Sequence, residues 1–171
     1  MNKVAVDRYD IDLLQALQRD GRATNSALGE KVHLSTSQVS RRIQRLEETD
    51  VISHYVAVLN PEVVGLGVIA FTHVTLDRQG EQGGRFEEAI ADIPEVLECL
   101  AVTGDADYIL RIAAPDLASF SDFMTTRLLR LPGVANVKST VTLKTIKQSF
   151  SLPLEHIKRP AQVKRQITFT K

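Results

Sequence analysis

Apolar residues recur at helical spacing three times near the start of the chain, and each run follows a residue suited to cap a helix. Asp7 precedes the first run, which predicts a helix over residues 8–19, and Gly21 offers a left-handed conformation to end it. Thr24 precedes a shorter helix that must end near His33, because a new pattern starts two residues later. Two short helices therefore precede the third run.

The third helix begins at a capping box formed by Ser35 and Gln38. Val39, Ile43 and Leu46 repeat at i, i+4 and i+7 and form its apolar stripe. The remaining surface is polar or basic and consists of Thr36, Ser37, Gln38, Ser40, Arg41, Arg42, Gln44 and Arg45. Three short helices with a turn of about three residues between the second and third predict a helix-turn-helix.

A different pattern follows. Residues 51–59 alternate weakly and are rich in valine and isoleucine, which predicts one or two short strands acting as a wing or a connection. Further strands and helices are expected, in order, at residues 68–76, 81–93, 96–103, 107–113, 116–131 and 134–146. The order βαββαβ is that of the ferredoxin-like unit, an α+β fold whose antiparallel sheet carries both helices on one face.

The strand over residues 68–76 has apolar residues in both of its alternating sets, so neither face is strongly polar. Two helices cover only one face of such a sheet. A second copy packed on the free face, giving a symmetric homodimer, is the favoured cover, and coverage by the chain's own tail is the alternative.

Composition is that of an ordinary globular protein, since 43% of the 171 residues are hydrophobic and 25% are charged. The single cysteine, Cys99, cannot form an internal disulfide, and no apolar run approaches the ~20 residues that span a bilayer, so we expect a cytoplasmic protein with no membrane partner. The net charge is zero, but residues 61–137 carry −7 and residues 138–171 carry +7. Local charge decides how a surface meets phosphate, because the Debye length is about 8 Å.

Seven short motifs occur in register with this architecture: Asp7-x-x-Asp10-x-x-Leu13-Leu14, Asp20-Gly21-Arg22, Leu34-Ser35, Arg41-Arg42-Ile43-x-Arg45-Leu46-Glu47, Asn60-Pro61, Gly104-Asp105-x-Asp107-Tyr108 and Leu131-Pro132-Gly133-Val134. Together they resemble the Lrp/AsnC (feast/famine) family of transcription regulators. The resemblance implies an N-terminal winged helix-turn-helix, a C-terminal ferredoxin-like effector domain, dimers that often assemble into octamers, and an amino acid as ligand.

Three positions depart from the family pattern. His33 stands where glycine is common in the turn, Ala106 where an aromatic residue is common, and Thr140 where a larger residue can occur. Histidine adopts a positive φ only at a cost. The chain is expected to divide into a helix-turn-helix DNA-binding domain, a wing or linker strand, a ferredoxin-like effector and oligomerisation domain, and a basic C-terminal extension, at residues 1–50, 51–66, 67–149 and 150–171.

The third helix is the candidate DNA reader, because a recognition helix places its N-terminal residues at base edges in the major groove. The candidate DNA-binding residues are Thr36, Ser37, Gln38, Ser40, Arg41, Arg42 and Arg45. Ser37, Gln38 and Arg41 are predicted to contact bases. Arg42 and Arg45 are predicted to contact phosphates. Two alternatives stay open: the capping box engages Gln38, and the last two arginines pair with the glutamates that follow them.

The turn over residues 103–107 is the candidate effector site. Gly104 lets a backbone amide approach a ligand, and a carboxylate there can hold an α-ammonium group. The alternative is an ordinary hairpin turn in which Asp105 or Asp107 caps its own backbone. By resemblance to the family, the effector binds where this turn meets another dimer. The surrounding residues would then be Ala101, Thr103, Gly104, Asp105, Asp107, Thr140 and Thr142.

Enzymatic activity is disfavoured. The four histidines have no mutual ligand spacing and no phosphate-binding glycine motif occurs, so the sequence implies no catalytic residue, no metal and no cofactor. The expected partners are double-stranded DNA, an amino acid or related small-molecule effector, and further copies of the chain in a homodimer, octamer or other higher oligomer. The alternative is an amino-acid-binding sensor or assembly module without gene-specific regulation.

The C-terminal extension is basic, with Glu155 as its one acid, and Val163, Ile167 and Phe169 are mostly spaced by two, as in a strand. Such a strand either adds to a sheet edge of a neighbouring subunit or lies along DNA. A frayed tail is the third possibility. We favour edge addition, because a disordered phosphate-binding arm has no use for the last two apolar residues.

Overall fold

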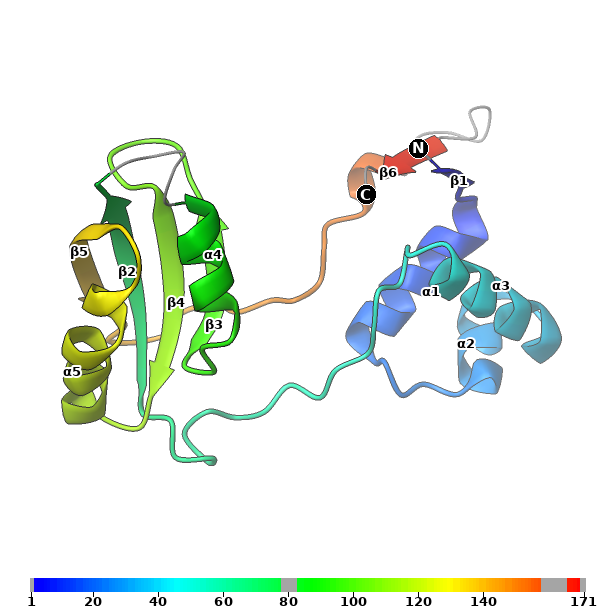
Figure 1. Cartoon of the computed structure of the whole chain (residues 1–171). Coiled ribbons are helices and arrows are strands. Elements are labelled where there is room, and N and C mark those ends of the chain that lie inside the picture. The colour runs from blue at the N-terminus through cyan, green and yellow to red at the C-terminus, as the bar shows by residue number, and fades with distance from the viewer. Residues whose placement is uncertain (1, 78–82, 158–165, 170–171) are drawn as a thin grey trace. The chain divides into compact units, whose positions relative to one another are not determined.

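The computed structural model describes residues 2–77, 83–157 and 166–169. The chain forms two compact units, one made of Met1–Ala57 with Lys147–Lys171 and the other of Val58–Ile146 (Figure 1). Both ends of the sequence therefore belong to the same unit, which also contains the three N-terminal helices.

Three helices make up the first unit: α1 (Arg8–Arg19), α2 (Asn25–Val32) and α3 (Thr36–Glu48). The side chains of Asp7, Thr24 and Ser35 each accept a hydrogen bond from the amide three residues later, as the sequence predicted. Leu13, Leu28 and Val39 are fully buried where the helices meet. These contacts confirm the helix-turn-helix.

The turn between α2 and α3 contains the strained histidine. His33 has φ 57° and ψ 46°, a left-handed conformation that confirms the positive φ expected at this position. The prediction for Gly21 is wrong, because the positive-φ glycines of the described chain are Gly65, Gly104 and Gly133. Helix α1 ends instead at an extended Asp20.

A two-stranded antiparallel sheet completes this unit and joins the two ends of the sequence. Strand β1 (Asn2–Ala5) pairs with β6 (Gln166–Phe169), with Asn2 opposite Phe169 (Figure 1). The sequence did not predict β1. The strand expected near the C-terminus forms over residues 166–169, but its partner is this chain's own β1 rather than a neighbour's edge, and Val163 lies outside the described residues.

Residues 51–59 form no strand, so the predicted wing is absent from the described chain. The backbone runs on without a ladder partner, because β propensity alone does not satisfy the amides and carbonyls of a single strand. Apolar side chains remain outside as a result: Val56 is 70% exposed and Leu59 is 65% exposed.

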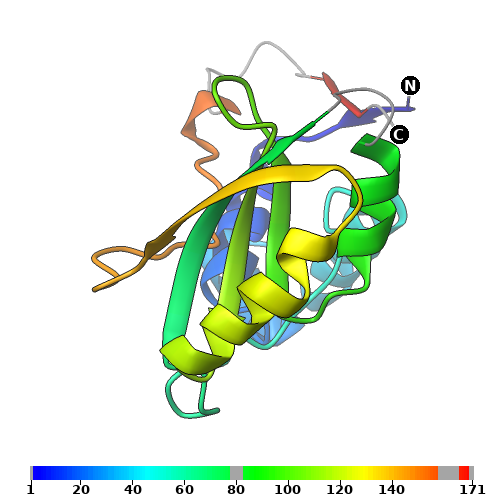
Figure 2. The same ribbon diagram turned by 60° about the vertical axis from the view of Figure 1, so that its left-hand side comes forward.

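The second unit has the predicted order βαββαβ, and its elements are β2 (Val68–Leu76), α4 (Gly83–Ala91), β3 (Val96–Ala101), β4 (Tyr108–Ala114), α5 (Leu117–Thr126) and β5 (Val134–Val141). A short 3₁₀ turn at Leu128–Arg130 follows α5, and a second 3₁₀ turn, Glu155–Ile157, belongs to the first unit. The strands lie in the order β3-β4-β2-β5, and every neighbouring pair is antiparallel. Figures 1 and 2 show α4 and α5 on one face of this sheet, which confirms the ferredoxin-like fold.

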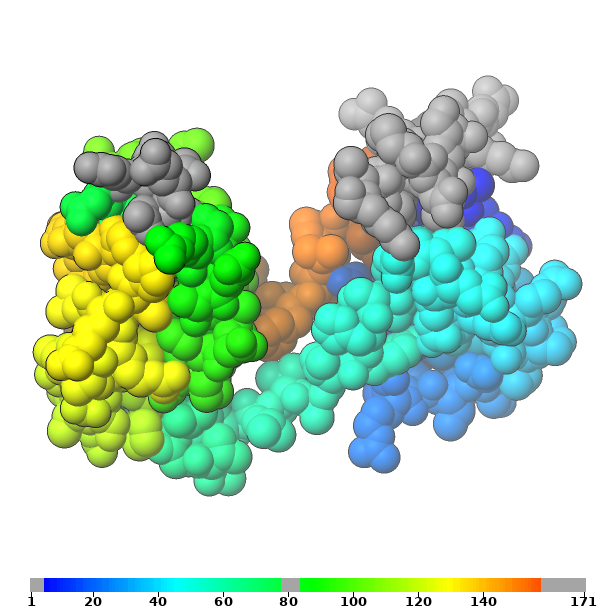
Figure 3. Space-filling view, viewed as in Figure 1, coloured from blue at the N-terminus to red at the C-terminus, as the bar shows by residue number. Residues whose placement is uncertain are grey.

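The core of this unit lies between the sheet and its two helices, whose side chains form a closed outer layer in Figure 3. Phe86 from α4 and Leu110 from β4 are fully buried there. The rings of Phe86 and Tyr108 lie 4.8 Å apart, and the Tyr108 hydroxyl donates to Glu87 over 2.8 Å. This bond, with burial, raises the pKa of Tyr108 to about 12. Among the described helices none is long and apolar enough to cross a membrane.

Candidate DNA-binding and effector sites

Helix α3 presents three faces, because each residue advances by about 100° around the axis. The apolar stripe packs inward, and Val39 and Leu46 are fully buried. The opposite face, which we call the exposed stripe, consists of Ser37, Ser40, Arg41 and Gln44. All four are exposed, and Arg41 has no hydrogen bond or ion pair with any residue that the structure describes. A free guanidinium therefore stands in the exposed stripe.

The capping box at the start of α3 engages Gln38. Gln38 Oε1 accepts hydrogen bonds from the Ser35 backbone amide and hydroxyl, each at 3.0 Å. The Gln38 backbone amide donates to Ser35 Oγ over 3.3 Å. Gln38 thus has the capping role that the sequence analysis gave as the alternative to a base contact. Its role at a DNA base stays a prediction.

Arg42 and Arg45 lie on the third face and reach back to the start of α1. Arg42 Nη1 donates to Asp10 Oδ1 over 2.7 Å and to Asp7 Oδ2 over 2.8 Å. Arg45 Nη2 donates to Asp10 Oδ2 over 2.5 Å, and its Nη1 donates to the Ala5 carbonyl over 3.3 Å. We call the set Asp7, Asp10, Arg42 and Arg45 the acid clasp.

Asp10 is the centre of the acid clasp. Its side chain is fully buried, whereas those of Asp7 and Arg45 are 47% and 42% exposed. Asp10 Oδ2 also accepts the Asp7 amide over 2.9 Å, so two guanidinium groups and one amide surround this carboxylate. A buried carboxylate needs such donors, because an unpaired charge in the interior is strongly destabilising.

The clasp also sets the ionisation of its partners. Burial alone would raise the pKa of Asp7, but the Asp10 amide and the Arg42 guanidinium outweigh it and hold that pKa below its ordinary value. Burial alone would lower the pKa of Arg42, yet the two carboxylates raise it. Both groups are therefore held in their charged forms.

The sequence reasoning missed Asp10 as a partner of the recognition helix. It offered two glutamates that follow Arg42 and Arg45 as alternative partners, but in the structure both arginines reach Asp10. One signal was available, since the two acids and the two arginines are both spaced by three residues and so share a helix face. The phosphate contacts of these arginines stay a prediction.

The candidate effector turn has the geometry of a braced hairpin. Asp107 Oδ2 accepts the Leu76 amide over 2.8 Å, and the Asp107 amide donates to the Val74 carbonyl over 2.9 Å. Gly104 has φ 121°, which side chains rarely adopt. The Asp105 carboxylate is exposed and has no hydrogen bond to a described residue. Asp107 thus holds the turn, while Asp105 faces solvent.

One subunit does not bring the two parts of the predicted effector site together. Thr140 pairs with Phe71, and the Thr142 amide donates to the Ile69 carbonyl over 2.8 Å. The turn is bonded further along the same strand, at Val74 and Leu76. At about 3.4 Å per residue these positions lie roughly 10–24 Å apart along β2.

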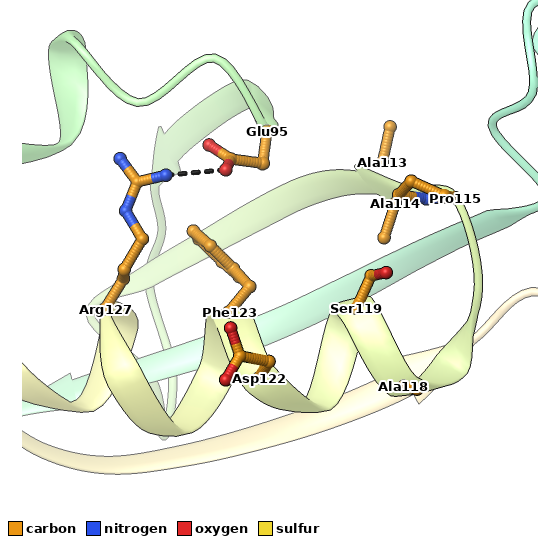
Figure 4. A pocket seen from close by; sticks show the side chains of 9 residues that line it. All are labelled: Glu95, Ala113, Ala114, Pro115, Ala118, Ser119, Asp122, Phe123 and Arg127. Atoms are coloured by element: carbon orange, nitrogen blue, oxygen red, sulfur yellow. Dashed lines mark hydrogen bonds and ion pairs between the residues drawn. The ribbon is translucent and has the colours of Figure 1, made fainter.

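A cavity of about 470 Å³ opens elsewhere, between α5 and the ends of β3 and β4 (Figure 4). Arg127 Nη1 donates to Glu95 Oε1 over 2.6 Å at one end, and small residues, among them Ala114 and Ser119, form the other. None of the predicted effector residues lines it. Among the described residues no group of three acids, histidines or cysteines could hold a metal ion.

Two family models match the chain. The AsnC-type helix-turn-helix domain matches residues 6–47, and the Lrp/AsnC ligand binding domain matches residues 69–152. Together they span both the acid clasp and the candidate effector turn.

Relatives match over most of the chain. The Bkd operon transcriptional regulator of Pseudomonas aeruginosa is 42% identical over 150 residues, which are 87% of this chain and 98% of the relative. The leucine-responsive regulatory protein of Escherichia coli is 35% identical over 151 residues, which are 88% of this chain and 92% of the relative.

Solved structures agree with the fold. A transcriptional regulator from Neisseria meningitidis in complex with L-Met is 41% identical, with a TM-score of 0.86 over 89% of this chain and 99% of the other. A feast or famine regulatory protein from M. tuberculosis, complexed with L-methionine, is 32% identical, with a TM-score of 0.80 over 86% of this chain and 99% of the other.

Proposed function

Since the chain belongs to the Lrp/AsnC family and is a DNA-binding transcriptional regulator, we propose that α3 reads double-stranded DNA through its exposed stripe and that an amino acid modulates this binding. One observation carries the first part: Arg41 is exposed and free of any described partner in the middle of the stripe. A guanidinium fork matches the O6 and N7 acceptors of guanine. Thr36, Ser37 and Ser40 flank Arg41 on the side where a recognition helix meets base edges.

The test uses the full chain and two duplexes, one selected by the protein from a random-sequence pool and one random duplex of equal length. Arg41→Ala is expected to lose about 1–3 kcal/mol of affinity for the selected duplex, and less for the random one. Lys144→Ala removes the same charge from the other unit and serves as control. Equal losses on both duplexes for Arg41→Ala would contradict base reading by this residue.

The effector part of the proposal rests on the turn over residues 103–107. Two relatives were solved with L-methionine, which makes an amino acid the ligand class to expect. Asp105 is assigned the α-ammonium group, because its carboxylate is exposed while Asp107 is bonded to the Leu76 amide. Thr140 and Thr142 would then come from a different subunit, since one subunit keeps them away from the turn.

A thermal-shift screen of the twenty amino acids tests the effector. A ligand at 100 times its Kd adds about 2.7 kcal/mol to the native state. Asp105→Asn is expected to remove the shift, whereas Asp92→Asn, an exposed acid of the same unit, keeps it. A shift that survives in the first variant would remove Asp105 from the site.

The same proposal includes self-association through the free face of the sheet. The apolar side chains of Phe71 on β2 and Leu100 on β3 remain 41% and 48% exposed. Large apolar side chains exposed on a sheet often mark an interface with another protein surface. A second sheet packed there would cover them, and a dimer could assemble further into octamers. Phe71→Asp is expected to lower the mass measured by sedimentation, while Leu117→Asp on α5 leaves it unchanged.

A further inference from the structure

We propose that Asp10 is a positioning residue for DNA recognition, and that Arg42 and Arg45 hold the recognition helix instead of contacting phosphate. The inference rests on the proposed function, since it concerns how α3 is presented to DNA. It starts from the acid clasp, in which a fully buried carboxylate on α1 is bonded by two arginines from α3.

The geometry explains why these arginines stay bonded to Asp10. Each Asp10 oxygen accepts one guanidinium, at 2.7 Å from Arg42 and 2.5 Å from Arg45. If Arg45 swung out to a phosphate, Asp10 Oδ2 would stay buried with only the Asp7 amide as donor. Leaving a buried charge with too few partners costs more than an exposed ion pair in water returns.

A second contact fixes Arg45 in the same place. Its Nη1 donates to the carbonyl of Ala5, the last residue of β1, over 3.3 Å. One side chain of α3 is thus bonded to the strand before α1 and to the first turn of α1. Arg42 is held in a similar way, because its guanidinium also lies 5.4 Å from the ring centre of Tyr9. The clasp therefore fixes α3 against the start of α1 at two positions, one turn apart.

The consequence for DNA binding is that the arginines of α3 have different roles. The clasp neutralises Arg42 and Arg45, so they release no counterions when DNA binds. Phosphate and base contacts of this helix then depend on the exposed stripe, with Arg41 as its one arginine. Asp10 acts on specificity through the orientation of α3, although it lies beneath the surface.

Salt dependence separates the two roles of an arginine. We would measure binding of the full chain to the selected and random duplexes by fluorescence anisotropy over a salt series. Removing a phosphate contact lowers the slope of log K against log salt by about 1. Arg42→Ala and Arg45→Ala are expected to keep the wild-type slope, whereas Arg41→Ala, on the same helix, changes the slope or the preference for the selected duplex.

Asp10→Asn tests positioning. It is expected to lower affinity for the selected duplex about tenfold or more while affinity for the random duplex stays or rises, because one positive charge of the clasp is no longer balanced by a carboxylate. A folding defect would lower both affinities by the same factor, and circular dichroism at the assay temperature checks that the variant is folded. Arg45→Ala tests the same inference if Asp10→Asn does not fold, because the Arg45 side chain is half-exposed whereas that of Asp10 is buried.

A slope reduced by about 1 in Arg42→Ala or Arg45→Ala overturns the inference, as do equal losses on both duplexes for a folded Asp10→Asn. Unchanged slopes with a reduced preference for the selected duplex support it. If Arg41→Ala alone leaves slope and preference unchanged, the proposed reader is wrong while the clasp result stands.

Discussion

Gly29→Ala is the change that most directly tests the packing of the helix-turn-helix. A Cβ at this buried position of α2 would lie 2.5 Å from the carbonyl oxygen of Leu34, about 0.9 Å short of the 3.4 Å at which ordinary contact begins. That carbonyl is backbone and cannot rotate away. A hydrogen bond also joins the turn to Gly29, because the Leu34 amide donates to the Gly29 carbonyl over 3.0 Å.

Two effects of opposite sign decide the outcome. Alanine in a helix gains about 1 kcal/mol over glycine, whereas overpacking of a rigid site costs about 1–3 kcal/mol and a disturbed hydrogen bond about 1 kcal/mol more. We therefore expect Gly29→Ala to lower the free energy of unfolding by about 1–3 kcal/mol and to weaken DNA binding, since the turn sets the direction of α3.

Urea unfolding followed by circular dichroism measures the change. Gly21→Ala is the matched control in the same unit: its Cβ would meet nothing nearer than 3.6 Å and its φ is not left-handed. The control should be unchanged or up to ~1 kcal/mol more stable. A Gly29→Ala protein as stable as the wild type would refute the reasoning about the turn.

Three further outcomes are expected. Ser35→Ala should lower the free energy of unfolding by about 1 kcal/mol through loss of the cap, and Ser35→Asp should restore most of it in the same urea assay. Tyr108→Phe should cost about 1 kcal/mol below pH 10. Since the folded pKa of about 12 lies above the ordinary 10, that cost should shrink as pH rises through 12, which unfolding over a pH series measures. Deleting residues 158–171 removes β6 and should speed hydrogen exchange in β1 at unchanged mass by light scattering; a smaller mass would show that the extension also pairs between subunits.

Local chemistry explains what the sequence predicted well. Caps such as Thr24 and Ser35 act on amides three residues away, so a short window of sequence contains the whole interaction. The βαββαβ order is likewise encoded by successive local patterns. The left-handed His33 was predictable because a turn of this kind needs a positive φ.

The errors arose where the partner is distant in the chain. Arg42 and Arg45 bond an acid 32 and 35 residues away, whereas local helix rules offered neighbouring glutamates. Residues 51–59 have the composition of a strand but find no ladder partner among the described residues. The assignment of Thr140 to the effector site is not an error of this kind and stays a prediction, because the resemblance placed the site where the turn meets another dimer and one subunit shows only the strand register of Thr140.

The ladder between β1 and β6 has a consequence for how the protein is made. Strand β6 leaves the ribosome ~160 residues after β1, and at roughly 5–20 residues per second this delay is on the order of 8–30 s. Once α3 has been made, at residue 48, the nascent helix-turn-helix has all three helices but still lacks the strand that pairs with its first residues. The backbone of β1 is then an unpaired strand edge. A neighbouring nascent chain on the same messenger could pair with this edge, so strand exchange between copies is possible until β6 has been made.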